Sequence, residues 1–293
     1  MFFRRLLLTL EIIKFEHSVF ALPFALTGAL LAWREMGFPS AMLVPKLLWI
    51  IVAMVAARSA GMTFNRILDA DVDARNPRTK NRHLPAGMLT PQFAWGFLVV
   101  ASFLFFLTAR KLNPLCLYLA PVALGLLFFY SFTKRFTAYS HLVLGLCLGA
   151  APAAAWIAVT GSLDARILLL TMAVAFWTAG FDIIYSCQDY EFDSSSELFS
   201  LPKQLGISTA LLVSRILHVA MIAFLGGLIA GFHLGWIAWI GIAAVAGLLI
   251  YEQSLVKADD LSRVDAAFFT VNGYVSMLFF IFWAADVFFL RQA

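Results

Sequence analysis

The feature that most constrains this chain is a succession of apolar segments, each about as long as a helix that crosses a lipid bilayer. The hydrocarbon interior is spanned by about 20 predominantly apolar residues. We predict about nine such spans, near 17–33, 47–68, 91–109, 113–132, 140–160, 167–188, 207–231, 234–251 and 266–289. Lipid cannot satisfy backbone polar groups, so these spans are expected to be helices. The sequence therefore predicts an all-α, polytopic membrane protein.

The composition agrees with lipid as the solvent, because 62% of the residues are hydrophobic and only 13% are charged. A soluble domain carries about 25% charged residues. No linker or composition shift divides the chain, which predicts a single domain over residues 1–293. Residues 1–14 are predicted to form an amphipathic helix on the cytoplasmic surface. No Lys/Arg tract stands out from the short loops, which argues against a nucleic-acid partner.

The distribution of Lys and Arg predicts the orientation in the membrane. Twelve of these residues lie on the side that holds the N-terminus and the loops after the second, fourth, sixth and eighth spans. Six lie on the other side. Cytoplasmic loops carry the excess of basic residues, so we expect the first side to face the cytoplasm.

Two acidic clusters stand at the cytoplasmic ends of the second and sixth spans. The first polar stripe consists of Arg58, Asn65, Asp69 and Asp73, and the second of Asp182, Asp189 and Asp193, with Tyr185 nearby. Positions four or seven apart share one face of a helix, so each stripe is expected to point in one direction. Asp71 and Glu191 fall on other faces. The clusters lie four spans apart, which suggests two related four-helix halves around a shared cavity, with a ninth helix added.

The two stripes carry like charge, so something cationic is expected between them. One alternative is that these acids are ordinary hydrated loop residues. Ionisable groups at membrane depth are costly, however, and usually mark a substrate or ion site. Carboxylate and amide oxygens suit Mg²⁺, which is typically held by one or two carboxylates and substrate phosphates. Basic side chains on the same side could hold a diphosphate: Arg75, Arg78, Lys80, Arg82, Lys134 and Arg135.

These motifs resemble those of the UbiA superfamily of intramembrane prenyltransferases. The stretch from Arg58 to Arg82 is similar to its N-x-x-x-D-x-x-x-D signature, and the stretch from Asp182 to Asp193 to its second, D-x-x-x-D, motif. Tyr130 to Arg135 is similar to its Y-x-x-x-K-R element, and the segment from Phe15 to Ala25 is also family-like. The resemblance covers spans one to six in the family's order.

The resemblance implies nine helices, a Mg²⁺-dependent site open to the cytoplasm of a bacterial-type inner membrane, and an isoprenoid channel reaching into lipid. Carried over by position, the magnesium and diphosphate residues are Asn65, Asp69, Asp73, Asp189 and Asp193. Lys134 would contact diphosphate, with Arg78, Lys80 and Arg135 as further substrate-binding cations. Asp182 and Tyr185 would lie near the reacting carbon or the acceptor. No obligate protein partner is implied.

Within the superfamily the chain is most similar to the 4-hydroxybenzoate polyprenyltransferase branch, including members associated with menaquinone synthesis by the futalosine route. The expected reaction is transfer of a polyprenyl group from its diphosphate to an aromatic acceptor. Ser131 stands where many hydroxybenzoate enzymes have Pro, which leaves naphthoate, haem or chlorophyllide acceptors open. An acceptor carboxylate could be met by Arg58, or by Arg215 with His218. An ion-coupled transporter is the alternative from another functional class.

Overall fold

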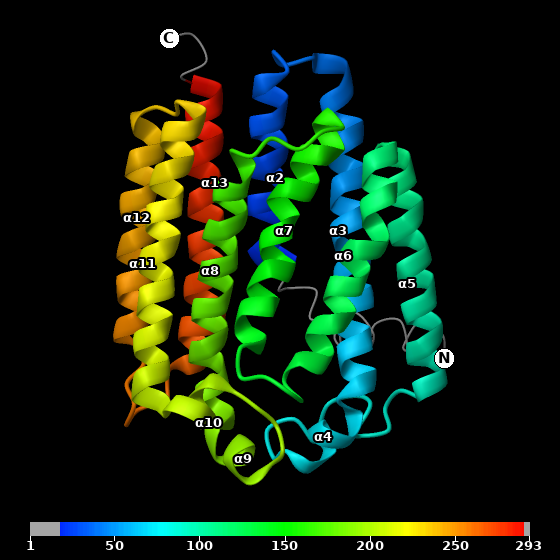
Figure 1. The fold of residues 1–293 in the computed structure, drawn as a ribbon, viewed down its shortest axis with the longest axis vertical. Coiled ribbons are helices and arrows are strands. Elements are labelled where there is room, and N and C mark those ends of the chain that lie inside the picture. The colour runs from blue at the N-terminus through cyan, green and yellow to red at the C-terminus, as the bar shows by residue number, and fades with distance from the viewer. Residues whose placement is uncertain (1–17, 290–293) are drawn as a thin grey trace.

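The structure is a computed structural model that describes residues 18–289, so the predicted amphipathic segment 1–14 lies outside the described residues. Within this range all the helical and strand elements are helices, and one isolated β-bridge joins Lys257 and Asp260. The long helices are α2 (Ser18–Glu35), α3 (Ser40–Leu68), α5 (Pro91–Leu112), α6 (Pro114–Thr133), α7 (Ser140–Thr160), α8 (Ile167–Ser186), α11 (Ile207–Phe232), α12 (Trp236–Ser254) and α13 (Asn272–Phe289) (Figure 1). The short elements are α4 (Ala70–Arg75), η2 (Cys187–Asp189), α9 (Tyr190–Ser195), α10 (Leu201–Leu205) and η3 (Ala266–Val271).

Each predicted span coincides with one of the long helices, and the predicted all-α polytopic fold is confirmed. Eight stretches of the described chain are long and apolar enough to cross a membrane, by length and composition. The remaining long helix, α2, has 18 residues and ends in Arg34 and Glu35. It packs against α7 and α13 inside the bundle, beside the other eight (Figure 1).

Local capping explains where several helices begin and end. Pro91 and Pro114 occupy the first helical positions of α5 and α6, where a missing N–H breaks no intrahelical hydrogen bond. Thr90 and Asn113 precede them, and the side-chain oxygen of each accepts a backbone N–H of the first turn. Gly161 ends α7 in the left-handed region, with φ 77°, which glycine adopts without a Cβ clash.

Close backbone contact joins α7 to its neighbours. A Cβ atom on Gly145 would lie 2.3 Å from the carbonyl oxygen of Ala175 in α8, and one on Gly149 would lie 2.5 Å from that of Thr171. A Cβ atom on Gly28 of α2 would lie 2.4 Å from the carbonyl oxygen of Pro152 in α7. Small residues allow helix backbones to approach in this way within membranes.

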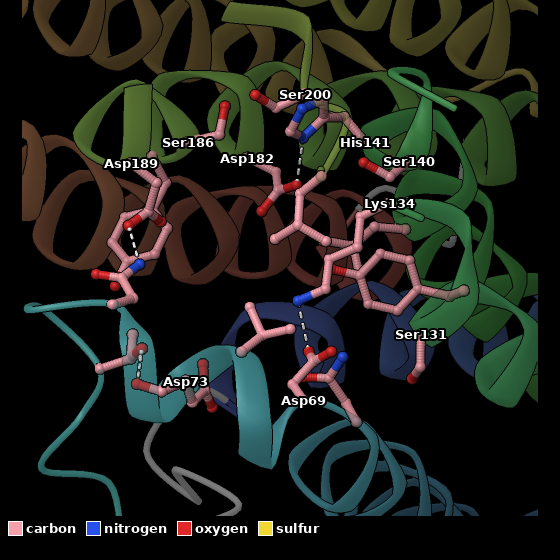
Figure 2. Close-up of a pocket in the computed structure, with 18 of the residues that line it drawn as sticks. Asp69, Asp73, Ser131, Lys134, Ser140, His141, Asp182, Ser186, Asp189 and Ser200 are labelled. Carbon is pink, nitrogen blue, oxygen red and sulfur yellow. Dashed lines mark hydrogen bonds and ion pairs between the residues drawn. The ribbon is translucent and has the colours of Figure 1, made fainter. Parts of the chain in front are cut away.

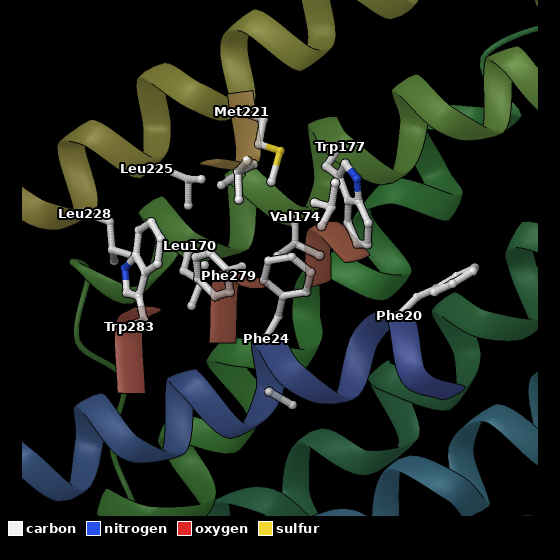
Figure 3. Packing of buried hydrophobic residues seen from close by; sticks show 14 of the residues in the cluster. Phe20, Phe24, Leu170, Val174, Trp177, Met221, Leu225, Leu228, Phe279 and Trp283 are labelled. Carbon is white, nitrogen blue, oxygen red and sulfur yellow. The ribbon is translucent and has the colours of Figure 1, made fainter. Parts of the chain in front are cut away.

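The main core lies where α2, α8, α11 and α13 meet. Phe24 packs between Trp177 and Phe279, with ring centroids 4.9 and 4.5 Å apart, and Phe279 stacks on Trp283 at 4.2 Å (Figure 3). These rings connect the first described helix with the last, so the helices enclose a common interior. All the short helices α4, α9 and α10 lie at the same end of the bundle (Figure 1). That end carries both aspartate motifs.

Candidate active site

Both aspartate motifs contain the same break in a helical segment. Asp69 follows α3 with φ −93° and ψ 1°, and Asp189 precedes α9 with φ −95° and ψ 5°. A six-residue helix follows each break. In the first motif, backbone hydrogen bonds from Asp69 N to Asn65 O (2.9 Å) and from Asp73 N to Asp69 O (2.7 Å) continue the four-residue spacing through the break. The dihedral angles of Asp69 and Asp189 are similar, although the 3-10 turn η2 leads into the second break, and the predicted relation between the two halves stays a prediction.

A cavity of about 290 Å³ lies between the two motifs. Its walls come from α2, α3, α6, α7, α8 and η3, together with the segments after α3 and α8 (Figure 2). Ten of the twelve predicted site residues line it: Arg58, Asn65, Asp69, Asp73, Arg78, Lys134, Asp182, Tyr185, Asp189 and Asp193. The fold therefore places residues from distant parts of the sequence around one space.

The other two predicted residues lie outside this lining. Arg135 still contacts the first motif, with Nη1 3.2 Å from Asp69 Oδ1. Lys80 is exposed, and its predicted contact with a diphosphate stays a prediction. Asp71 and Glu191 are also exposed and face away from the cavity, as their helical positions predicted.

Protein cations neutralise the first motif. Asp69 and Asp73 are buried, with 2% and 4% of their surfaces exposed. Lys134 Nζ donates to Asp69 Oδ2 at 2.6 Å (Figure 2), and Arg82 Nη1 donates to both carboxylate oxygens of Asp73 at 2.7 and 2.8 Å. Arg66 adds a longer contact to Asp73, at 3.7 Å. A buried carboxylate is strongly unfavourable unless it is paired, and these contacts give both acids cationic partners.

The second motif is held by a cation from the first. Arg78, in the loop after α4, donates from Nε to Asp189 Oδ1 at 2.9 Å and from Nη2 to Asp189 Oδ2. Asn76 Nδ2 donates to the same carboxylate at 2.9 Å, and Arg78 Nη1 donates to the hydroxyl of Tyr185 at 2.9 Å. Burial alone would lower the pKa of Arg78, but its bonds to Asp189 and Tyr185 raise that pKa above its usual value. The cation expected between the two stripes is thus supplied, in part, by the protein itself.

A histidine pairs with the deepest acid of the second stripe. His141 Nδ1 lies 2.6 Å from Asp182 Oδ2 (Figure 2). His141 is 5% exposed, and its Nε2 has no hydrogen-bond partner in the part of the chain that the structure describes. Over the same residues, Oδ1 of Asp182 accepts no hydrogen bond. One carboxylate oxygen is therefore fixed by the protein, and the other is available to the cavity.

Arg58 is the deepest predicted cation and lines the cavity from α3. Its Nε is buried, and across residues 18–289 it has no hydrogen-bond partner. Asp69, an acid of the same polar stripe, is paired with Lys134 and not with Arg58. The other candidates for an acceptor carboxylate, Arg215 and His218, do not line the cavity. His218 lies behind α8, where Cβ on Gly180 would be 2.4 Å from its Nε2, so the arrangement favours Arg58.

Five aromatic side chains form one side of the cavity, which we call the aromatic wall: Phe20, Phe181, Tyr185, Phe268 and Phe269. The ring of Phe268 lies 4.2 Å from that of Tyr185, 5.2 Å from that of Phe181 and 6.0 Å from that of Phe20. Four of the five were not singled out from the sequence. No signal separated these four phenylalanines from the rest of the 29 in the chain.

Several polar residues at the site were also missed by sequence reasoning. Asn76 and His141 hold acids of the second stripe, and Arg66 contacts Asp73. A signal existed for Arg66, because it precedes Asp73 by seven residues and so shares its helix face. His141 was recognisable only as a histidine near the start of an apolar span, which does not identify a partner.

Comparison with known proteins identifies the family. The profile of the UbiA prenyltransferase family matches residues 21–284. The 4-hydroxybenzoate octaprenyltransferase of Vibrio parahaemolyticus is 32% identical over 228 residues, which cover 78% of this chain and 80% of the relative. That of Aliivibrio fischeri is 34% identical over 248 residues, covering 81% and 82%.

Solved structures give the same answer. An apo UbiA homolog of Aeropyrum pernix superposes with a TM-score of 0.82 at 34% identity, over 92% of this chain and 98% of that one. A UbiA homolog of Archaeoglobus fulgidus bound to DMAPP and Mg²⁺ superposes with a TM-score of 0.75 over 95% and 98%. At 19% identity this second likeness concerns the fold. By its sequence and its fold, the chain belongs to the UbiA prenyltransferase family.

Proposed function

We propose that the protein uses magnesium to transfer a polyprenyl group from its diphosphate to an aromatic acceptor, and that the acceptor is 4-hydroxybenzoate or a related quinone precursor. The observation that carries the proposal is the meeting of both aspartate motifs at one cavity, beside the aromatic wall. The relatives named 4-hydroxybenzoate octaprenyltransferase, which the chain matches over about four fifths of its length, support this choice of acceptor.

The donor set fits magnesium bound together with a diphosphate. Mg²⁺ prefers oxygen ligands and is usually held by one or two carboxylates plus substrate phosphates. No three His, Cys, Asp or Glu side chains between residues 18 and 289 form a ready-made metal cluster. We therefore assign shared coordination with the diphosphate to Asn65, Asp69, Asp73, Asp189 and Asp193. When bound, the ion would supply positive charge that stabilises the diphosphate as it leaves.

Arg78 and Lys134, which line the cavity, would bind the diphosphate oxygens directly, and Arg135 would reach them from beside Asp69. Each already contacts a motif aspartate, so binding of the magnesium diphosphate exchanges one set of charge-assisted bonds for another. Neither the acids nor the cations are left unpaired by this exchange. Lys80, exposed outside the cavity, would meet only a diphosphate at its mouth.

The unpaired groups deeper in the cavity favour a hydroxylated aromatic acid as the acceptor. Arg58 offers a cation without a partner among the described residues, and Asp182 offers one carboxylate oxygen. A ring that carries a carboxylate and a hydroxyl group can satisfy both. The hydroxyl would donate to Asp182 Oδ1, which increases the electron density of the ring, while Tyr185 lies along the wall beside it.

The reaction breaks the bond between C1 of the allylic chain and the diphosphate oxygen, and both electrons leave with the oxygen. A ring carbon next to the hydroxyl-bearing carbon supplies the electron pair for the new carbon–carbon bond, and loss of its proton restores aromaticity. The aromatic wall would stabilise the positive charge on C1 through its ring faces and keep water away from it.

The chain is an integral membrane protein. We place it in a bacterial cytoplasmic membrane, with the N-terminus and the cavity on the cytoplasmic side. The twelve-to-six distribution of Lys and Arg supports this orientation, because the motif end carries the larger number.

Prenyl transfer by the purified protein tests the function. We expect Mg²⁺-dependent prenylation of 4-hydroxybenzoate with geranyl diphosphate, and a loss of at least about 100-fold in kcat in Asp69→Asn and Asp189→Asn. The matched controls are Asp71→Asn and Glu191→Gln, which change exposed acids of the same motifs. Equal activity in all four variants would contradict the proposed site. Product from another aromatic acid alone would keep the reaction and change the acceptor.

A further inference from the structure

The backbone that carries two residues of the aromatic wall is a π-helix. This turn, η3, precedes α13 and contains Phe268 and Phe269, both of which line the cavity. A π-turn is rare, because it widens the helix and misaligns the usual hydrogen bonds, and it is found frequently at functional sites. Some additional interaction must therefore hold η3 in this form.

That interaction comes from the side chain of Asn272, the first residue of α13. One N–H of its Nδ2 is shared between the carbonyl oxygens of Ala267, at 3.1 Å, and of Phe268, at 3.2 Å. The side chain thus satisfies carbonyl groups inside the π-turn, one of which belongs to a residue of the wall. Asn272 is completely buried, so no water substitutes for these bonds.

Two further buried residues hold the amide of Asn272 in place. Glu252 Oε1 accepts from Asn272 Nδ2 at 2.7 Å, and Trp177 Nε1 donates to Asn272 Oδ1 at 2.7 Å. All three residues are 0% exposed, and none of them lines the cavity. The triad Glu252–Asn272–Trp177 joins α12, α13 and α8. Glu252 Oε2 makes no hydrogen bond among the described residues and lies 3.6 Å from His218 Nδ1. The bonds that are made fix the geometry of the amide more strictly than apolar packing would.

The triad connects to the reacting end of the cavity through the wall. Phe268 packs on Tyr185 at 4.2 Å, and the hydroxyl of Tyr185 accepts from Arg78, which also pairs with Asp189. A shift of η3 would therefore displace the ring on which Tyr185 rests. It would also open the wall at the place where the proposed allylic cation forms.

We propose that Glu252, Asn272 and Trp177 are positioning residues, which hold the π-turn so that Phe268 and Phe269 close the aromatic wall around the allylic cation. This inference rests on the proposed prenyl transfer. Closure of the aromatic wall determines whether the acceptor ring or water attacks the C1 cation. With the wall closed, the ring carbon of the acceptor supplies the electron pair. With the wall open, water supplies it through its oxygen, loses one proton, and yields prenyl alcohol and free diphosphate.

The test compares Asn272→Leu and Glu252→Ala with two controls. Glu252→Gln keeps an oxygen that can accept from Asn272. Asp286→Leu removes a buried acceptor of two backbone N–H groups at the opposite end of α13, so it lowers stability without touching η3. Each protein receives Mg²⁺, geranyl diphosphate and 4-hydroxybenzoate, and prenylated acid and geraniol are quantified. We expect the ratio of geraniol to prenylated acid to rise about tenfold in the first two variants and to stay unchanged in both controls.

Hydrogen–deuterium exchange of residues 266–271 gives a readout independent of activity. We expect faster exchange there in Asn272→Leu and Glu252→Ala, and unchanged exchange in Glu252→Gln. A wild-type product ratio with wild-type exchange in either of the first two variants would overturn the inference, as would an equal shift in Asp286→Leu. Wild-type protein without any Mg²⁺-dependent product would instead contradict the proposed function, and the exchange data would still decide whether the triad holds the turn.

Discussion

The hydrogen bond between His141 and Asp182 allows the effect of His141→Leu on kcat to be worked out from the structure. The two atoms, Nδ1 and Oδ2, lie 2.6 Å apart, and the side chain of Asp182 is only 18% exposed. A hydrogen bond to a charged group contributes about 1.5–3 kcal/mol. If Asp182 must keep this orientation in the transition state, His141→Leu lowers kcat by about 10- to 150-fold, since about 1.4 kcal/mol corresponds to a factor of ten.

The matched variant is His141→Asn, whose Nδ2 can take the place of the imidazole Nδ1 as the donor to Asp182. We expect this variant to keep kcat within about fivefold of wild type, because the bond is retained. The assay measures kcat and KM for 4-hydroxybenzoate at saturating geranyl diphosphate and Mg²⁺, with the KM for geranyl diphosphate determined separately. A positioning role changes kcat and the KM for the acceptor, and leaves the KM for the diphosphate unaltered.

Two results would refute this reasoning. Equal activity of His141→Leu and wild type would mean that the bond does not orient Asp182 during the reaction. Equal losses in His141→Leu and His141→Asn, with equally lowered melting temperatures, would assign the effect to packing of the buried imidazole.

Further outcomes concern the cation between the motifs, the metal and the helix contacts. In steady-state kinetics, Arg78→Lys should lower kcat/KM for geranyl diphosphate about tenfold, because lysine keeps the charge but lacks the planar guanidinium group. Arg78→Met, which also removes the charge, should lower it about 100-fold. Chelation by EDTA should abolish transfer, and titration with Mg²⁺ should restore it more fully than Ca²⁺, which prefers larger coordination shells. Gly145→Ala should destabilise the protein by about 3 kcal/mol, read as a lower melting temperature in detergent, because its Cβ meets a backbone oxygen at 2.3 Å. Gly125→Ala, with open space around its Cβ, should leave the melting temperature unchanged.

The helices were predictable because hydropathy over about 20 residues reports directly on the lipid environment. The ends of the helices were harder to predict where charged residues lie inside a helix. The expected span 47–68 begins at Ser40 in the structure, since Lys46 turns its ammonium group to the carbonyl oxygens of Ala158 and Val159 at the end of α7. The span expected to end at 251 continues to Ser254, because Glu252 is buried in the bundle.

The residues of the site that share one helix face were predictable from their spacing. Four-residue intervals placed Asn65, Asp69 and Asp73 on one face, and the structure brings all three to the cavity. Spacing contains no information about contacts between distant segments. The bridge from Arg78 to Asp189, the π-turn at 266–271 and the aromatic wall depend on how the helices pack, so none could be derived from the sequence.

The glycine contacts between α7 and α8 bear on how the cavity admits its substrates. Because Gly145 and Gly149 let the two backbones touch, neither helix can slide along the other without a collision. His141 and Asp182 lie on these two helices, so we expect this side of the cavity, where the acceptor is proposed to bind, to be rigid. Arg78 belongs to a loop that meets the opposite motif through side chains alone. We expect this loop to move when a prenyl diphosphate enters, while the part of the cavity between α7 and α8 keeps its shape.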